Sequence, residues 1–378
     1  MTTLTARQLN RATLARQLLL RREKVGVVEA VHRVMAIQAQ EPASPYLALW
    51  NRVAGFDPAD LDRAFADHTV IKASLMRMTL HAVDAADYPA FHTAMTRSLR
   101  AARLGDRRFT DSGLTTADAD AVVRDVLAFA SEPRTNAEFD AFLEKRFGPL
   151  PGNGPWWALR TFASLHHAPT GGPWSFGQKP SYVAATEDAE RPPVEEATRT
   201  LVRRYLEGFG PATIADIAQF SVRYREPIRA AVEAMADELV VFDGPGRAAL
   251  YDIPGGLLPR EDEPAPPRLL PMWDSVLMAY DDRSRVIPPD YRRRFIHQNG
   301  DVLPSLLVDG FVAGVWRPVE GGIEATAFHA LSKAVWRDLA SEAHDLVAFL
   351  AARDPQVYRR YGHWWAAQPS AEVRILSA

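Results

Sequence analysis

Two glutamines, Gln38 and Gln40, stand two residues apart near the start of the chain, with Ala39 between them. Pro42 follows closely, and the residue before a proline avoids the α-helical region, so we expect extended backbone here. In an extended chain, residues i and i+2 point to the same face. Each amide oxygen can then accept a hydrogen bond from water or lie against a developing positive charge. The same pattern also fits two solvated polar residues at the end of a helix.

Other familiar catalytic and cofactor motifs are missing from the sequence. The chain has no cysteine, which excludes disulfides, thiolate zinc sites, iron–sulfur clusters and a cysteine nucleophile. It has no phosphate-binding GxxxxGKS/T loop, no GxGxxG after a strand and no HExxH helix. A GxSxG nucleophile elbow is also missing. We therefore predict no metal and no cofactor.

Positive charge is concentrated in the N-terminal third, although the whole chain carries a formal net charge of −3. Residues 1–108 hold 16 Lys and Arg against 10 Asp and Glu. This asymmetry suggests an anionic partner at one surface. A second basic cluster lies further along, and we predict that its arginines contact phosphate groups: Arg283, Arg285, Arg292, Arg293 and Arg294. A run of charge is also compatible with an ordinary solvated surface.

A period of two along residues 71–83 predicts a strand or hairpin. In this arrangement Arg77, Thr79 and His81 share one face, and the neighbouring apolar residues share the other. The three polar residues are candidates for a pocket wall or for binding contacts. The alternative is a half-exposed sheet face without a role in binding.

Helices followed by a short β element recur along the chain. The clearest copy places a helix from Pro211 to Phe220 and a second from Arg225 to Asp237. Two short strands then follow, at 239–242 and 248–253, around a loop containing glycine and proline. Two helices at a tight turn followed by a two-stranded wing are typical of a winged helix-turn-helix.

We predict an α+β fold, mainly α, with three tandem winged helix-turn-helix modules and a C-terminal β-rich domain. The predicted modules span residues 1–86, 87–190 and 191–260, and the C-terminal domain spans 261–378. In that domain we expect strands at 269–270, 276–279, 303–308 and 311–316, an Asp-Gly hairpin turn at 309–310 and a long helix over 328–352. No apolar run approaches the length of a membrane span, and the N-terminus does not resemble a signal peptide, so we expect a cytoplasmic protein.

Four segments of this sequence resemble the winged-helix DNA glycosylases of the AlkZ and YcaQ type. The first is VMAIQAQEPASPY at 34–46, with Leu49 and Trp50 after it, and the second is MRMTLH at 76–81. The third is LLPMWDSVLMAY at 269–280 with Asp282 and Arg283, and the fourth is LVDG at 307–310 with GVW at 314–316. The four segments occur in the family's order and span most of the chain.

The resemblance implies an architecture, a site and an activity. Three winged helices and a β-rich domain form a C-shaped concavity of DNA size, with the Gln-x-Gln residues at its centre. Members remove N7-alkylated purines, and some unhook interstrand crosslinks made by DNA-alkylating natural products. A sister branch has Asp at the second Gln position; Gln40 therefore favours the AlkZ branch. By this resemblance Gln38 and Gln40 are catalytic, and the partner is double-stranded DNA carrying an N7-alkylguanine or a crosslink.

The expected chemistry is consistent with two amides. Glycosidases usually need a carboxylate, but an N7-alkylguanine is already cationic and leaves as a neutral base, so it needs no general acid. We therefore expect a monofunctional, metal-independent glycosylase that gives resistance to an alkylating natural product. No heptad repeat suggests dimerisation, and we expect a monomer.

Two alternatives from other functional classes remain at this point. A repeated winged helix without catalysis would be a DNA-binding protein or transcription regulator. A protein that binds the alkylating compound itself would protect cells without releasing any base.

Overall fold

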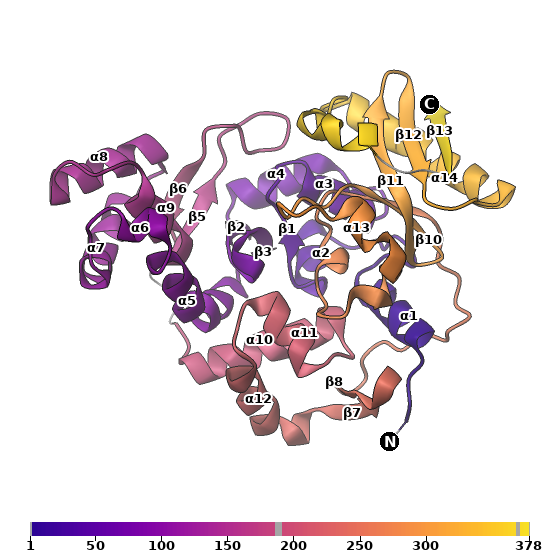
Figure 1. Cartoon of the computed structure of the whole chain (residues 1–378), viewed down its shortest axis with the longest axis horizontal. Coiled ribbons are helices and arrows are strands. Elements are labelled where there is room, and N and C mark those ends of the chain that lie inside the picture. The colour runs from indigo at the N-terminus through magenta and orange to yellow at the C-terminus, as the bar shows by residue number, and fades with distance from the viewer. Residues whose placement is uncertain (1, 186–190, 368–370, 378) are drawn as a thin grey trace.

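Helices and small antiparallel sheets alternate along the chain in the computed structural model, which describes residues 2–185, 191–367 and 371–377 (Figure 1). The chain is an α+β protein that is mainly helical, as predicted. Three successive groups of helices each end in a small sheet, and a five-stranded sheet follows near the C-terminus. Within the described residues, no helix combines the length and apolarity needed to cross a membrane.

The first group contains the Gln-x-Gln segment. Its elements are α1 (Ala6–Arg16), α2 (Val27–Arg33), β1 (Ile37–Gln38), α3 (Ser44–Trp50), α4 (Pro58–Ala66), β2 (Val70–Ser74) and β3 (Leu80–Asp84). The sheet has the antiparallel order β1–β3–β2. Between β2 and β3 the chain makes a 3₁₀ turn, η1 (Met76–Met78), in which Arg77 has a φ of 57°. The predicted β element is therefore a hairpin, and its turn interrupts the period of two.

The second group, on the left in Figure 1, is built around a longer helix. Its elements are α5 (Tyr88–Leu104), α6 (Arg107–Thr110), α7 (Thr116–Phe129), β4 (Arg134–Thr135), α8 (Asn136–Phe147), α9 (Gly154–Phe162), β5 (Leu165–Ala168) and β6 (Ser181–Ala184). The sheet order is β4–β6–β5. Thr135 caps α8 by accepting a hydrogen bond from the backbone N–H of Glu138.

The third group follows the predicted order most closely. It contains α10 (Val194–Phe209), α11 (Ile214–Ser221), α12 (Arg225–Ala234), β7 (Val240–Asp243) and β8 (Ala249–Asp252). Thr213 and Asp216 form a reciprocal capping box that begins α11. Residues 186–190, at the predicted boundary between the second and third modules, lie outside the described residues. The assignment of the three groups as winged helices, with their boundaries, remains our interpretation.

The C-terminal group is β-rich with one long helix. Its strands are β9 (Arg268–Leu270), β10 (Ser305–Val308), β11 (Phe311–Val319), β12 (Gly322–Ala327) and β13 (Glu372–Ser377), and its helices are α13 (Arg292–Phe295) and α14 (Lys333–Ala351). The sheet order is β13–β12–β11–β10–β9. Asp309 and Gly310 join β10 to β11 with φ values of 48° and 82°, as the hairpin signal predicted.

The strand predicted at 276–279 is wrong. Residues Ser275–Leu277 form a 3₁₀ turn, η4, because the Asp274 carboxylate accepts a hydrogen bond from the N–H of Val276 and begins the turn. The apolar run in this segment reflects burial, since Val276 and Leu277 are both in the core. A short apolar run does not distinguish a strand from another buried segment.

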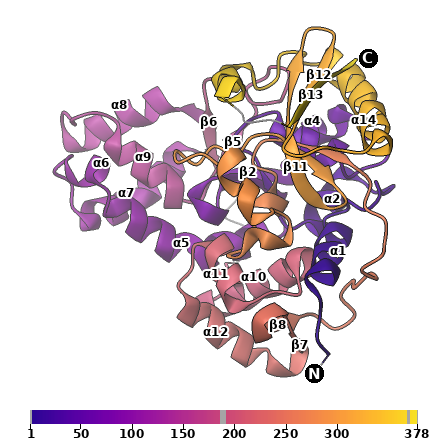
Figure 2. The ribbon, with the colours of Figure 1, turned by 45° about the vertical axis from the view of Figure 1, so that its right-hand side comes forward.

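Buried ion pairs connect groups that are far apart in the sequence. Arg16 of α1 makes a two-pronged ion pair with Asp252 of β8, both N···O distances being 2.7 Å. Arg52, just after α3, holds Asp274 in the same way at 2.8 Å. Figures 1 and 2 both place α1 between the third group and the C-terminal group. The N-terminal helix therefore connects the third group and the C-terminal group.

Candidate active site

Gln38 ends the strand β1 in extended backbone, and Gln40 lies at a bend just beyond it. Gln38 pairs with His81 of β3, and the N–H of Ala39 donates to the Leu80 carbonyl over 2.7 Å. The Gln38 N–H donates to the hydroxyl of Ser275 over 3.2 Å, which in turn donates to the Ala36 carbonyl over 2.8 Å. The segment is thus held both by its own sheet and by Ser275, the first residue of η4.

The two glutamine side chains have different surroundings. Gln38 is only 5% exposed, and its amide oxygen accepts the backbone N–H of Gln40 over 2.9 Å. Gln40 is exposed and lines a cavity of about 730 Å³. We expected both amides to face one site. In the structure Gln38 instead fixes the backbone of Gln40, and Gln40 presents its side chain at the cavity.

The hairpin residues predicted to share one strand face are separated. Arg77 lies in the turn η1, so its side chain is not part of the alternating strand pattern. Thr79 lines the cavity beside Gln40 and donates to the Met76 carbonyl over 3.2 Å. His81 is 1% exposed, faces Phe220 edge-on, and burial lowers its pKa to about 4. His81 is therefore a neutral, packed side chain at neutral pH.

Several arginines near this segment have no carboxylate partner among the described residues. Burial lowers the pKa of Arg77. Burial, with repulsion from Arg77 and Arg292, lowers the pKa of Arg283 to about 10. Burial and nearby Arg97 likewise lower the pKa of Arg223. The buried Nε atoms of Arg223 and Arg283 lack hydrogen-bond partners in the described part of the chain. Asp281 partly offsets the charge near Arg283, but none of these arginines forms an ion pair among the described residues, and such cations are suited to binding an external anion.

The remaining arginines predicted to bind phosphate differ in position. Arg285 is buried, donates to the Pro211 carbonyl over 2.8 Å and lies 4.2 Å from the Tyr280 ring centre. Its predicted phosphate contact is therefore wrong, because the guanidinium takes part in packing between groups. Arg294 is half-buried against the ring of Phe328. Arg292 and Arg293 are exposed on α13 and stay candidates.

Comparisons with known proteins bear directly on this arrangement. A model of the DNA glycosylase AlkZ-like family matches residues 31–349, which include Gln38 and Gln40. The chain belongs to this family. The interstrand DNA cross-link repair glycosylase of Streptomyces sahachiroi is 25% identical over 332 residues, which cover 83% of this chain and 88% of that protein. The solved structure of Streptomyces sahachiroi DNA glycosylase AlkZ matches with a TM-score of 0.77 at 23% identity, covering 90% of this chain and 95% of that one.

Family membership confirms the resemblance found in the sequence. It favours an AlkZ-like DNA glycosylase over the two alternatives, a non-catalytic DNA-binding protein and a drug-sequestering protein. DNA is accordingly the partner that fits the unpaired arginines. The likeness to the solved AlkZ structure supports the fold.

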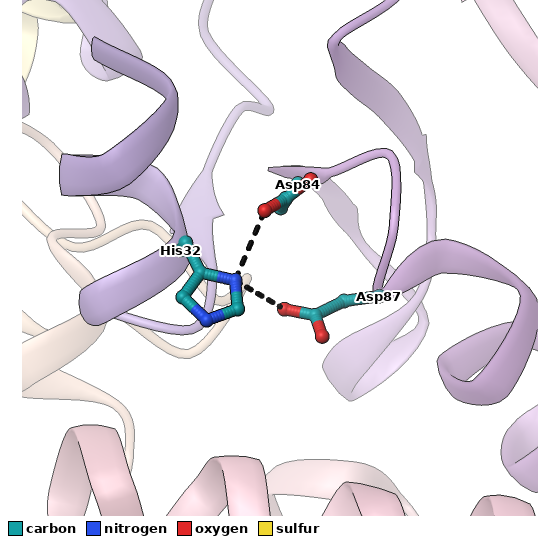
Figure 3. Close-up of side chains that lie close together, drawn as sticks. All are labelled: His32, Asp84 and Asp87. Carbon is teal, nitrogen blue, oxygen red and sulfur yellow. Dashed lines mark hydrogen bonds and ion pairs between the residues drawn. The ribbon is translucent and has the colours of Figure 1, made fainter. Parts of the chain in front are cut away.

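One group in the described residues of this AlkZ-like protein has the composition of a metal site: His32, Asp84 and Asp87 (Figure 3). The Nδ1 atom of His32 lies 2.9 Å from Asp84 and 3.5 Å from Asp87. Arg204 donates to the Asp87 carboxylate over 3.0 Å and also to the His32 carbonyl. Because a guanidinium already occupies this group, we interpret it as a network of ion pairs between the first and third groups.

Two cavity residues of the AlkZ-like protein were missed from the sequence. Glu41 follows Gln40 directly, and its carboxylate accepts hydrogen bonds from Tyr361, over 2.9 Å, and from Arg360. Burial raises its pKa despite these partners. Lys72 is buried in the middle of β2 and also lines the cavity. The only sequence signal for Lys72 is that it stands alone inside the apolar run VIKAS. This pattern does not indicate which residues the lysine contacts.

Proposed function

We propose that this protein is a DNA glycosylase that hydrolyses the N-glycosidic bond of bulky N7-alkylpurine adducts, including adducts within interstrand crosslinks. It would thereby protect a cell against a DNA-alkylating natural product. The observation that carries this proposal is the placement of Gln40. Its amide is exposed at a large cavity, while its backbone is fixed by a buried hydrogen bond to Gln38.

The reaction follows from the charge of the substrate. An N7-alkylguanine is a cation, so breaking its glycosidic bond releases a neutral base and leaves positive charge on the sugar. The amide oxygen of Gln40 orients the attacking water or stabilises that charge. No proton donor to the base is required. Water is the nucleophile in this excision step, which makes the base-removal chemistry monofunctional.

The second part of the proposal is that the unpaired arginines bind the DNA backbone. Arg77 belongs to the hairpin beside the Gln-x-Gln segment, Arg223 to the third group, and Arg283 to the segment that follows η4. A DNA backbone that contacts all three would pass close to Gln40. Phosphate contacts fix register and orientation and are independent of base sequence. We propose that one protein molecule binds one damaged site in this way.

Excision of 7-methylguanine from a defined duplex tests the proposal. The expected products are the free base, detected by mass spectrometry, and an abasic site that alkali converts to a strand break. Gln40→Ala serves as the matched inactive variant, with DNA affinity measured in parallel. A duplex crosslinked through N7 then tests unhooking. DNA binding without any released base would overturn the proposal in favour of a binding protein.

A further inference from the structure

Lys72 is a buried amine without a polar partner. Its residue is 4% exposed, and among the described residues its side chain makes no hydrogen bond and no ion pair. The Nζ atom lies 4.2 Å from the centre of the Phe176 ring. The Nζ atom itself is not fully enclosed by protein, so it can reach a ligand in the cavity. Since Lys72 lines the cavity that Gln40 also lines, the cavity is where an acceptor for this amine would lie.

The sheet register places the cavity and His81 on opposite sides. Lys72 pairs with Ala82, which pairs with Ile37, whereas Gln38 pairs with His81. Since successive residues of a strand point to opposite faces, Lys72 lies on the face away from Gln38 and His81. Gln40 comes after β1 ends and lines the cavity on the Lys72 side. The cavity therefore extends from Gln40 along the back of the sheet.

Several aromatic side chains and several N–H donors line the cavity. Trp157, Trp174, Phe176 and Tyr182 all line it. Arg103 lies 4.2 Å from the Trp157 ring centre, and Arg160 donates to the hydroxyl of Tyr182 over 3.0 Å. These arginines have no carboxylate partner in the described part of the chain.

The two carboxylates on the cavity wall are already engaged. Glu41 is bound by Arg360 and Tyr361, and Asp354 accepts the indole N–H of Trp174 over 3.1 Å. The cavity thus offers ring faces together with N–H donors that have no carboxylate partner among the described residues. A planar group that carries an acceptor matches both features. The volume, about 730 Å³, is within the roughly 300–1,000 Å³ range of sites for drug-sized ligands.

We propose that this cavity is the subsite for the non-nucleotide part of the adduct, and that Lys72 selects substituents with an aromatic ring and a carbonyl acceptor. The inference rests on the proposed function and specifies its substrate class. The guanine stays near Gln40 while its N7 substituent extends toward Lys72. The aromatic walls hold the ring, and the amine donates to the carbonyl oxygen.

The protonation of Lys72 is compatible with this role. Burial lowers its pKa to about 7, and the carboxylate of Glu41 opposes that change. Besides Glu41, the charged and titratable groups on the cavity wall are Arg103, Arg160, Arg360, Asp354, His167, Tyr182 and Tyr358. Both the ammonium and the neutral amine carry N–H groups, so Lys72 remains a donor on either side of neutral pH.

Three duplexes that differ only in the N7 substituent test the proposal. They carry 7-methylguanine, N7-benzylguanine, which adds a ring, or N7-phenacylguanine, which adds a ring and a carbonyl. Single-turnover excision is measured for each and divided by its spontaneous depurination rate. Lys72→Met should lower excision of the phenacyl adduct by roughly tenfold, the usual effect of one lost hydrogen bond of this type. The methyl and benzyl adducts should change less than about twofold by the same reasoning.

Further variants separate the ring from the carbonyl. Phe176→Leu should slow the benzyl and phenacyl adducts alike and spare the methyl adduct. Lys72→Gln, which keeps an N–H donor, should restore part of the phenacyl rate, and Lys145→Met, at an exposed position of α8, should change nothing. Equal losses on all three adducts, or none on the phenacyl adduct, would overturn the inference. A wild-type protein that excises none of the three would instead refute the proposed function, and the inference with it.

Discussion

Replacing each glutamine by methionine should separate a residue that faces the reaction from one that positions it. Methionine keeps the approximate side-chain volume and removes the amide. Gln40→Met removes the exposed amide at the cavity, and loss of one positioned transition-state contact typically slows a reaction by roughly 10²–10³-fold. The free energy of unfolding should stay near that of the wild type, because Gln40 is exposed.

Gln38→Met should act through a different route. Gln38 is buried, and its amide oxygen is the acceptor for the Gln40 N–H. Removing it leaves the partly buried N–H of Gln40 without its acceptor, and loss of one such hydrogen bond typically costs about 0.5–1.5 kcal/mol. The urea midpoint should therefore fall, and excision should slow because the backbone of Gln40 is no longer fixed. In the double variant, the rate should be close to that of Gln40→Met alone, since both changes act through one side chain.

The assay is single-turnover release of 7-methylguanine, with urea unfolding and DNA affinity measured on the same preparations. Affinity should change less than about twofold, because neither glutamine lies among the unpaired arginines. The reasoning fails if Gln40→Met turns over at the wild-type rate. It also fails if the effects of the two substitutions on the activation free energy are additive, since Gln38 would then contribute to the reaction independently of Gln40.

Four further outcomes are expected. Arg283→Met should reduce the slope of log affinity against log salt by about 0.9, as titrations between 50 and 200 mM salt would measure; an unchanged slope would remove this arginine from the interface. Asp274→Asn leaves Arg52 charged and unpaired in the core and should lower the free energy of unfolding by roughly 3–5 kcal/mol in urea, unlike an exposed Asp. Excision should survive EDTA and also the substitution His32→Gln, and activity restored only by a divalent ion would reveal a catalytic metal. Because burial lowers the pKa of Lys72 to about 7, the unfolded chain binds this proton more tightly; the stability of the wild type relative to Lys72→Met should therefore rise between pH 7 and pH 10 in urea unfolding.

Local signals predicted the parts of the structure that local interactions determine. The chain leaves helical geometry before Pro42, and Gln38 lies in an extended strand. The helix predicted from Pro211 to Phe220 is observed as α11, which begins at a capping box between Thr213 and Asp216. The Asp309-Gly310 pair adopts the positive φ values that a tight hairpin needs. In each case the deciding contacts lie within a few residues in the sequence.

The site could not be predicted where long-range contacts decide it. Arg285 looked like its basic neighbours, but Pro211 and Tyr280 hold it inside the protein. The surroundings of Lys72 depend on Phe176, which comes from another group and packs against it. The different roles of the two glutamines depend on Ser275, more than 200 residues away, which holds the Gln38 backbone. Such long-range pairings cannot be inferred from a single sequence.

The buried Arg16–Asp252 and Arg52–Asp274 pairs affect how damage is found. Breaking either pair would leave a charge stranded in the interior, so the groups that they join cannot swing apart cheaply. These groups therefore keep a nearly fixed arrangement relative to one another. If a duplex has to bend or open to bind between groups held in this way, the energy of that distortion depends on the DNA. Alkylation weakens pairing and stacking at the lesion, so damaged DNA deforms more easily than its neighbours. Recognition would then depend first on how easily the DNA deforms, before any side chain contacts the altered base.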